Sequence, residues 1–215
     1  MKIRTANELF DRIAADQAWR KKEVTIFAAQ VSESRGVIRA ALLRPAIALL
    51  YAHWEGFIKN TVHYYLVYLS EQKVPLDSLR DEIVARCMRA RIGAAANSKR
   101  ISPHIEVIKH FRDDGSNPAR IPILRSDVDT ASNLTFGVLT DLLSSIGCAT
   151  DEYDSYEGLI DEHLVGSRNK IAHGESHYVE MEQWEELKRE IFELMDLIAF
   201  QIVEAAEHKT YLLAI

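Results

Sequence analysis

The chain is predicted to be an all-α protein built as a bundle of helices. Most of its segments repeat apolar residues at intervals of three and four, which is typical of amphipathic helices. Only 9 glycines and 5 prolines occur in 215 residues, which argues against a loop-rich or all-β design. A chain of this length can bury a sizeable core in one domain. We therefore expect a single helical domain over residues 1–215, with its longest helices near both ends.

Two long helices are expected in the first third of the chain. Thr5 can cap a first helix that extends to about Val31, and Gly36 marks the break after it. The second helix is expected to run to about Gln72, with Pro45 as an early kink or restart. Its wide aromatic stripe suggests that it lies at the centre of the bundle. The residues expected to face inward from the first helix are Leu9, Phe10, Ile13, Trp19 and Ile26.

Residues 73–150 are interpreted as an inserted cap of shorter helices. Apolar spacing predicts these helices at about 79–94, 103–112 and 134–145. The cluster at 113–118 contains Asp, Gly, Asn and Pro, and it predicts a turn.

The last third of the chain is expected to hold two more helices. One should run from about Ser155 through Arg168 and the residues that follow. The other is the most regular of the chain, because its apolar residues alternate steps of three and four. They are Trp184, Leu187, Ile191, Leu194, Ile198, Ile202 and Ala205. Such a narrow seam suits packing along another helix at a shallow angle.

The charge is unevenly distributed along the chain. The net charge is −6, but residues 80–125 hold ten lysines and arginines against five acidic residues. The rest of the chain holds 16 basic residues against 27 acidic ones. A basic middle could bind phosphates. It could equally be a solvated helical face, so both interpretations stay open.

The composition also bounds the compartment and the chemistry. Residues 1–8 lack the apolar core of a signal peptide, and the longest apolar run, residues 45–54, is far shorter than a membrane span. Cys87 and Cys148 are too few for a disulfide framework and lack the spacing of a zinc site. We expect a cytoplasmic protein with reduced thiols, no membrane contact, and no metal or cofactor.

The segment 167–174 places Arg168, Asn169 and His173 close together, in a helix that Gly174 could end. At about 100° per residue, Asn169 and His173 share one face, whereas Arg168 lies about 140° from His173. One helix therefore does not aim the arginine and the histidine at one point. This geometry favours a site that a second copy of the chain completes across a two-fold axis.

These residue types are sufficient for metal-independent cleavage of RNA. His173 could deprotonate the 2′-hydroxyl or protonate the departing 5′-oxygen. Arg168 could hold the phosphate and offset its growing negative charge, and Asn169 could orient the imidazole or the substrate. By spacing alone, an arginine that caps helix carbonyls and a histidine bound at a turn explain the same residues.

Two stretches resemble the HEPN family of helical domains. Residues 168–174, Arg-Asn-Lys-Ile-Ala-His-Gly, look like its signature of arginine and histidine separated by four to six residues. Residues 51–59, Tyr-Ala-His-Trp-Glu-Gly-Phe-Ile-Lys, resemble the first core helix of the RiboL-PSP-HEPN branch. The resemblance covers about 40–72 and 153–207, and it explains neither the basic middle nor the first helix.

The resemblance implies a helical bundle that forms a homodimer through the face bearing the motif. It also implies a metal-independent endoribonuclease with Arg168, Asn169 and His173 in its catalytic site. Similar proteins are toxins or effectors of prokaryotic toxin–antitoxin and anti-phage defence systems. An antitoxin or a sensor protein restrains them.

Other residues are candidates for supporting roles. Glu55 could orient His173 or Arg168, or it could be a surface carboxylate. Lys170 and His177 could contact RNA, or they could be exposed loop residues. A helical interaction module without enzymatic activity, which binds a nucleotide, RNA or a partner protein, remains the alternative function. A weaker possibility is a nucleic-acid-binding protein that uses the basic residues 80–125 without catalysis.

Overall fold

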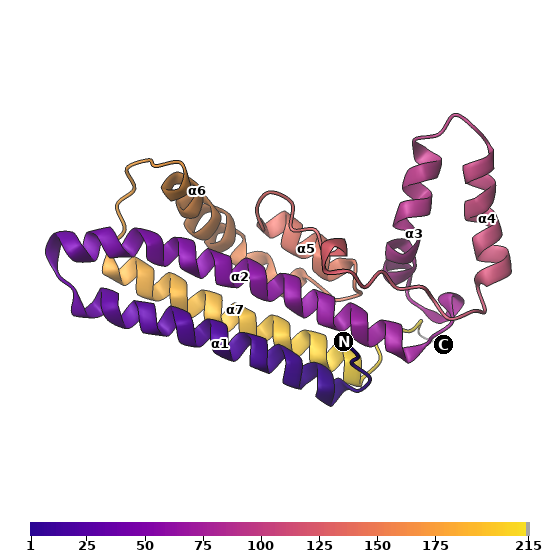
Figure 1. Cartoon of the computed structure of the whole chain (residues 1–215), viewed down its shortest axis with the longest axis horizontal. Helices are drawn as coiled ribbons and strands as arrows, with labels where there is room; N and C mark the ends of the chain where they lie inside the picture. The colour runs from indigo at the N-terminus through magenta and orange to yellow at the C-terminus, as the bar shows by residue number, and fades with distance from the viewer. Residues whose placement is uncertain (214–215) are drawn as a thin grey trace.

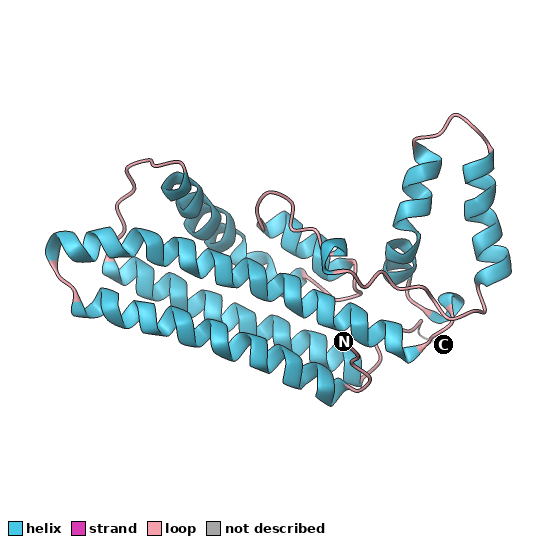
Figure 2. Cartoon of the chain, in the orientation of Figure 1, coloured by secondary structure: helices cyan, strands magenta, loops and turns pink. Residues whose placement is uncertain are grey.

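The computed structural model describes residues 1–213, except for the side chains of residues 113 and 114. Helices make up 74% of the chain and the described residues form no strand, which confirms the predicted all-α fold (Figure 2). The single domain predicted over residues 1–215 includes residues 214 and 215, which lie outside the described residues.

Three long helices lie side by side and form the bundle (Figure 1). They are α1 (Ala6–Glu33), α2 (Gly36–Gln72) and α7 (Met181–Glu207). Thr5 caps α1 as predicted, because its hydroxyl accepts a hydrogen bond from the Glu8 amide while the Glu8 carboxylate accepts one from Thr5. Helix α2 contacts both α1 and α7, and its apolar and aromatic side chains form much of the core.

The prediction of which α1 residues face inward is wrong for three of the five. Phe10, Trp19 and Ile26 are 56%, 48% and 58% exposed. Leu9 and Ile13 are buried as expected, and the other buried positions of α1 are Asp16, Arg20, Val24, Ala28 and Val31. Asp16 and Arg20 are charged, so the apolar periodicity of the sequence predicts that they are exposed, but both are buried.

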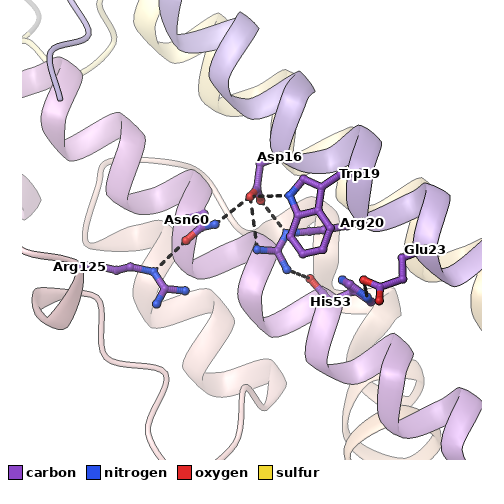
Figure 3. A network of polar contacts seen from close by, with 7 residues as sticks. All are labelled: Asp16, Trp19, Arg20, Glu23, His53, Asn60 and Arg125. Carbon is purple, nitrogen blue, oxygen red and sulfur yellow. Dashed lines mark hydrogen bonds and ion pairs between the residues drawn. The ribbon is translucent and has the colours of Figure 1, made fainter.

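Asp16 and Arg20, both on α1, form a buried ion pair on the face of α1 that contacts α2 (Figure 3). The Asp16 carboxylate accepts hydrogen bonds from Arg20 Nε at 2.7 Å and from Asn60 Nδ2 at 2.8 Å. It also accepts one from the Trp19 indole at 3.2 Å. Asn60 in turn accepts a hydrogen bond from Arg125 at 2.9 Å, so the network joins α1, α2 and the segment beyond residue 120.

By length and composition α2 could span a membrane, a property that it shares with the core helices of soluble proteins. The apolar run 45–54 is too short to predict this property, which belongs to the whole helix. In the structure its central residues, such as Trp54, Phe57 and Ile58, are fully buried in the bundle. We keep the prediction that the chain does not contact a membrane.

Residues 73–150 hold short helices, and two of them form a hairpin that projects from the bundle (Figure 1). The elements are the 3₁₀ turn η1 (Leu76–Ser78), α3 (Asp81–Ala96), α4 (Ser102–Asp114), the 3₁₀ turn η2 (Arg125–Asp127) and α5 (Phe136–Ser144). Helix α4 extends two residues into the turn expected at 113–118. Backbone bridges join Pro75 to Pro118 and Leu79 to Leu212, so the base of the hairpin is tied to the chain around it. That this region is an insertion stays a prediction.

Both cysteines are free thiols, as the sequence analysis expected. Burial raises the pKa of the Cys87 thiol to about 11 and that of Cys148 to about 12. Neither thiol is therefore ionised near neutral pH, which makes both poor nucleophiles.

Candidate active site around Arg168

The motif lies on a short helix that follows an unusual winding of the chain. Instead of one α-helix from Ser155, the chain forms the 3₁₀ helix η3 (Asp151–Tyr156), the π-helix η4 (Leu159–Gly166) and then α6 (Ser167–Ala172). A π-helix takes more residues per turn than an α-helix, so it changes the direction in which later side chains point. The direction of Arg168 is therefore set by η4 as well as by its place in α6.

Gly174 ends α6, as predicted. Its φ is +75°, in the left-handed region that glycine adopts without strain. The Gly174 amide donates to the Ile171 carbonyl at 3.1 Å, and the Glu175 amide donates to the Lys170 carbonyl at 2.9 Å. These two bonds form a Schellman motif, which fixes the backbone that follows His173.

We expect Gly174→Ala to destabilise the protein by about 1–2 kcal/mol, because an alanine pays a steric cost at this φ. The free energy of unfolding, measured by chemical denaturation, tests this prediction. Gly158→Ala is the matched control. Gly158 has helical backbone angles and open space where a Cβ would lie, so this change should not destabilise. Equal losses in both variants would contradict the role of Gly174.

Arg168 is half-buried and points toward α2. Its guanidinium carbon lies 4.6 Å from the centre of the Tyr51 ring, in a cation–π contact. Nη1 donates hydrogen bonds to the side-chain oxygens of Asn133 and Asn169, both at 2.7 Å. Among the described residues no carboxylate pairs with Arg168, and Nε and Nη2 have no hydrogen-bond partner. The guanidinium is thus oriented by neutral groups and keeps donors for an anionic ligand.

Tyr51 connects Arg168 with Glu55. The Tyr51 hydroxyl accepts a hydrogen bond from the Leu134 amide at 2.8 Å. Burial raises the pKa of Tyr51, and the negative charge of nearby Glu55 raises it further, while the Leu134 bond and the charge of Arg168 lower it. The phenol therefore stays neutral near pH 7, and its ring supports the arginine.

Glu55 contributes to this site indirectly, through the loop that carries Asn133. Its Oε1 accepts a hydrogen bond from the Thr130 hydroxyl at 2.6 Å, which holds the loop that also carries Asn133. No hydrogen bond or ion pair joins Glu55 to Arg168 or His173 within the described part of the chain. The structure places Glu55 beside the predicted site, as a carboxylate that positions the loop.

His173 is separated from Arg168 in this single chain. It is exposed at the C-terminal cap of α6, and its side chain makes no hydrogen bond to any described residue. Asn169 lies between the two, but its side-chain oxygen binds Arg168 and not the imidazole. The structure therefore gathers Arg168, Asn169 and Glu55 around Tyr51, and leaves His173 facing solvent.

The other two candidates differ in exposure. Lys170 is exposed, and His177 is half-buried. Burial lowers the pKa of His177, and the positive charges of Lys170 and Arg44 lower it further. His177 is accordingly neutral at pH 7, which suits hydrogen bonding better than charge pairing.

A cavity of about 520 Å³ opens beside the motif, between α2, η4 and α7. Ser167, next to Arg168 in sequence, lines it together with His163 and His177, and Glu186 and Glu190 line it from α7. Within the described residues no three histidine, cysteine, aspartate or glutamate side chains are grouped so that they could hold a metal ion.

Sequence reasoning missed Tyr51, Thr130 and Asn133 as residues of this site. Tyr51 belongs to the aromatic stripe of α2 and begins the stretch 51–59 that resembles a HEPN core helix, but neither observation predicts a role for it in the site. Asn133 and Thr130 belong to a loop some 35 residues before the motif, and no spacing rule connects them to it. The only signal in the sequence was that Tyr51 and Glu55 are one helical turn apart, on one face of α2.

Fold and site together define an all-α protein with an arginine and a histidine on one short helix against a long bundle. The sequence model of the HEPN_MAE_28990-like HEPN family matches residues 9–211. The chain therefore belongs to the HEPN family. No curated protein and no solved structure matches the chain.

The match confirms the family and extends the resemblance that the sequence showed. It includes the first helix and the basic residues 80–125, which the two resembling stretches left out. Members of the family are commonly ribonucleases that act on RNA, and they often form dimers. The RiboL-PSP branch within the family, and the roles of Arg168 and His173, stay predictions.

Proposed function

We propose that the chain is a metal-independent endoribonuclease whose site is completed across a homodimer. The observation that carries this proposal is the state of Arg168. Its guanidinium is oriented by Tyr51, Asn133 and Asn169, yet no carboxylate in the described part of the chain neutralises it. A positive charge that is held in place and still has free donors suits a phosphate that gains negative charge during cleavage.

In the proposed reaction, Arg168 binds the scissile phosphate and His173 of the second chain transfers the proton. The imidazole removes the proton of the 2′-hydroxyl, whose oxygen attacks the phosphorus. The bond to the 5′-oxygen breaks, and that oxygen takes up a proton from the imidazolium or from water. The products are a 2′,3′-cyclic phosphate and a 5′-hydroxyl. DNA lacks the 2′-hydroxyl and should not be cut.

The need for a second chain follows from the placement of His173. In one chain Arg168 is turned toward α2, while His173 is exposed at the end of α6 with no partner among the described residues. A two-fold axis near α6 would bring the arginine of each chain to the histidine of the other. The exposed Lys170 and the half-buried His177 would then flank the RNA.

We expect mixtures of Arg168→Ala and His173→Ala chains to regain activity that neither variant has alone. In a mixed dimer one site combines an intact Arg168 with an intact His173, while the other site has neither. Half of the randomly paired dimers are mixed, so the mixture should reach about a quarter of wild-type activity. Cleavage of a labelled RNA in EDTA, after the chains have exchanged, measures this recovery.

The biological role that we propose is that of a toxin or effector in a prokaryotic toxin–antitoxin or anti-phage defence system, acting in the cytoplasm. A free ribonuclease would harm its host, so an antitoxin or a sensor protein should restrain it. Expression of the wild-type chain alone should arrest growth, whereas expression of the Arg168→Ala chain should not.

A non-enzymatic binding module is the second candidate, because the contacts with Tyr51, Asn133 and Asn169 give Arg168 a structural role that needs no substrate. Such an arginine could serve to hold the loop around Asn133 against α2. Under this reading Arg168→Ala and Arg168→Lys would change stability or partner binding, and both variants and the wild-type chain would be equally inactive on RNA and equally harmless on expression.

A further inference from the structure

Helix α4 carries an apolar stripe on the face turned away from its hairpin partner. Ile101, at its start, and Ile105 and Ile108 within it are 72%, 42% and 52% exposed. Pro103 and Val107 are half-buried and mark the side of α4 that packs on α3. At about 100° per residue, the three isoleucines lie about 140–200° from Pro103. The stripe therefore faces outward.

Within the described residues of its own chain, nothing covers this stripe. Phe111, 48% exposed, lies three residues after Ile108 at the edge of the stripe nearest Val107, and none of the described residues of α4 is buried. The hairpin projects away from the bundle (Figure 1), so α4 does not reach α7 of the same chain. Burying one such side chain contributes about 1.5–3 kcal/mol, and a contiguous apolar stripe of this kind marks an interaction surface.

The charges nearest the stripe are positive. Within residues 99–114 the cations are Lys99, Arg100, Lys109 and Arg112, against the carboxylates of Glu106, Asp113 and Asp114. Lys109 and Arg112 follow Ile105 and Ile108 by four residues, which places these two cations beside the stripe. Lys109 lies 3.6 Å from Glu106, in a weak exposed ion pair. The surface that covers the stripe should thus have an apolar centre and an acidic rim.

The outward face of α7 has this character. Phe200 and Leu197 are 66% and 43% exposed. Glu193, Glu204 and Glu207 lie seven residues before, four after and seven after Phe200, which places them on the same face of the helix. Their partners within the chain are few: Glu193 lies 3.9 Å from Arg189, and Glu204 lies 3.1 Å from His208.

We propose that α4 of one chain docks on the outward face of α7 in a second copy of the same chain. The isoleucines of α4 would cover Leu197 and Phe200, while Lys109 and Arg112 would approach Glu193 and Glu204. In a two-fold dimer this contact is made twice, which doubles the buried area. The contact is separate from the face that carries Arg168, so it does not depend on the proposed ribonuclease activity.

Sedimentation velocity over a range of protein concentrations tests the proposal by mass. The wild-type chain should sediment at a multiple of its 24.5 kDa. Ile105→Asp with Ile108→Asp should halve that mass, and so should Phe200→Asp. Ala90→Asp with Ala94→Asp adds the same two charges to exposed positions of α3, away from the stripe, and it should leave the mass unchanged. Circular dichroism confirms that each variant keeps its helices.

Charge reversal adds a test of pairing that general damage to the fold would not mimic. Lys109→Glu with Arg112→Glu should weaken association, and so should Glu193→Lys with Glu204→Lys. All four changes in one chain should restore it, because the attraction is re-formed with opposite signs. A wild-type chain that sediments as a single chain at every concentration would overturn the proposal. So would an Ile105/Ile108 variant with the mass of the wild type.

Discussion

His173→Ala is expected to lower the rate of RNA cleavage by about 10²–10⁴-fold, the usual contribution of a general acid or base. The side chain is exposed at the end of α6 and makes no hydrogen bond within the described chain, so its removal breaks no internal contact. The loss should therefore appear in the rate and not in stability. Cleavage of a labelled mixed-sequence RNA by purified protein in EDTA measures the first, and thermal unfolding measures the second.

His208→Ala is the matched control for this experiment. His208 is an exposed histidine that caps α7, as His173 caps α6. The C-terminal end of α7 and helix α6 lie toward opposite ends of the bundle (Figure 1). Its removal should leave cleavage unchanged. If His173→Ala and His208→Ala cut RNA as fast as the wild type, the nuclease does not use His173, and the proposed mechanism is wrong.

Arg168→Ala should differ from His173→Ala in one informative way. It should abolish cleavage as well, but it also removes the hydrogen bonds to Asn133 and Asn169 and the contact with Tyr51. A moderate loss of stability is therefore expected for Arg168→Ala alone. This asymmetry follows from the structure, since the sequence presents the two residues as equal members of one motif.

The long helices could be predicted from the sequence because their signals are local. Thr5 with Glu8, Gly36 and Gly174 mark helix ends through their own backbone and side-chain chemistry. The observed bounds of α1 and α2 agree with the expected ones within about two residues, a difference that fraying of helix ends explains. The seam of α7 was also correct, since all of its predicted apolar residues are buried.

The buried face of α1 could not be predicted in this way. Its buried positions do follow helical spacing, but two of them, Asp16 and Arg20, are charged. Charged residues are rarely buried unless they are paired, and the pairing here also needs Asn60 from another helix. Trp19 is partly exposed because its indole binds Asp16 and stacks on Arg20 at the edge of the bundle.

The candidate site was predictable only in part for a similar reason. The nearness of Arg168, Asn169 and His173 is set by the sequence, but the direction of each side chain depends on distant segments. The loop of Thr130 and Asn133 and the π-helix before α6 decide where Arg168 points. Neither leaves a local pattern that could be read in advance.

The same buried network explains Gly56, the third residue of the Trp54-Glu55-Gly56 stretch of α2. A Cβ at position 56 would lie 2.5 Å from Nη1 of Arg20. Arg20 cannot easily move away, because Asp16 binds both its Nε and its Nη2 and the His53 carbonyl accepts from its Nη1. Each residue of the stretch thus has its own role: Trp54 fills the core, Glu55 holds the loop, and Gly56 makes room for the arginine.

Asp16→Ala is expected to destabilise the protein by about 3–5 kcal/mol, because it leaves Arg20 buried without its counter-charge. Both side chains of the pair are 8% exposed, so solvent screens their interaction little. The change also removes the acceptor of the Asn60 and Trp19 hydrogen bonds (Figure 3). The free energy of unfolding from urea denaturation measures the loss, and Asp11→Ala, at an exposed position of the same helix, should cost little.

The double variant Asp16→Ala with Arg20→Met separates two contributions to the loss of unfolding free energy. One is the burial of an unpaired Arg20 charge, and the other is the loss of packing. If the penalty arises because Arg20 is left charged and unpaired, replacing it with an apolar side chain of similar length should recover part of the stability. If the double variant is instead as unstable as the sum of the two single variants, the residues act independently, and their ion pair does not stabilise the packing of α1 on α2. A recovery of stability would show that each charge is needed mainly to neutralise the other, and that apolar contacts alone could hold the bundle together.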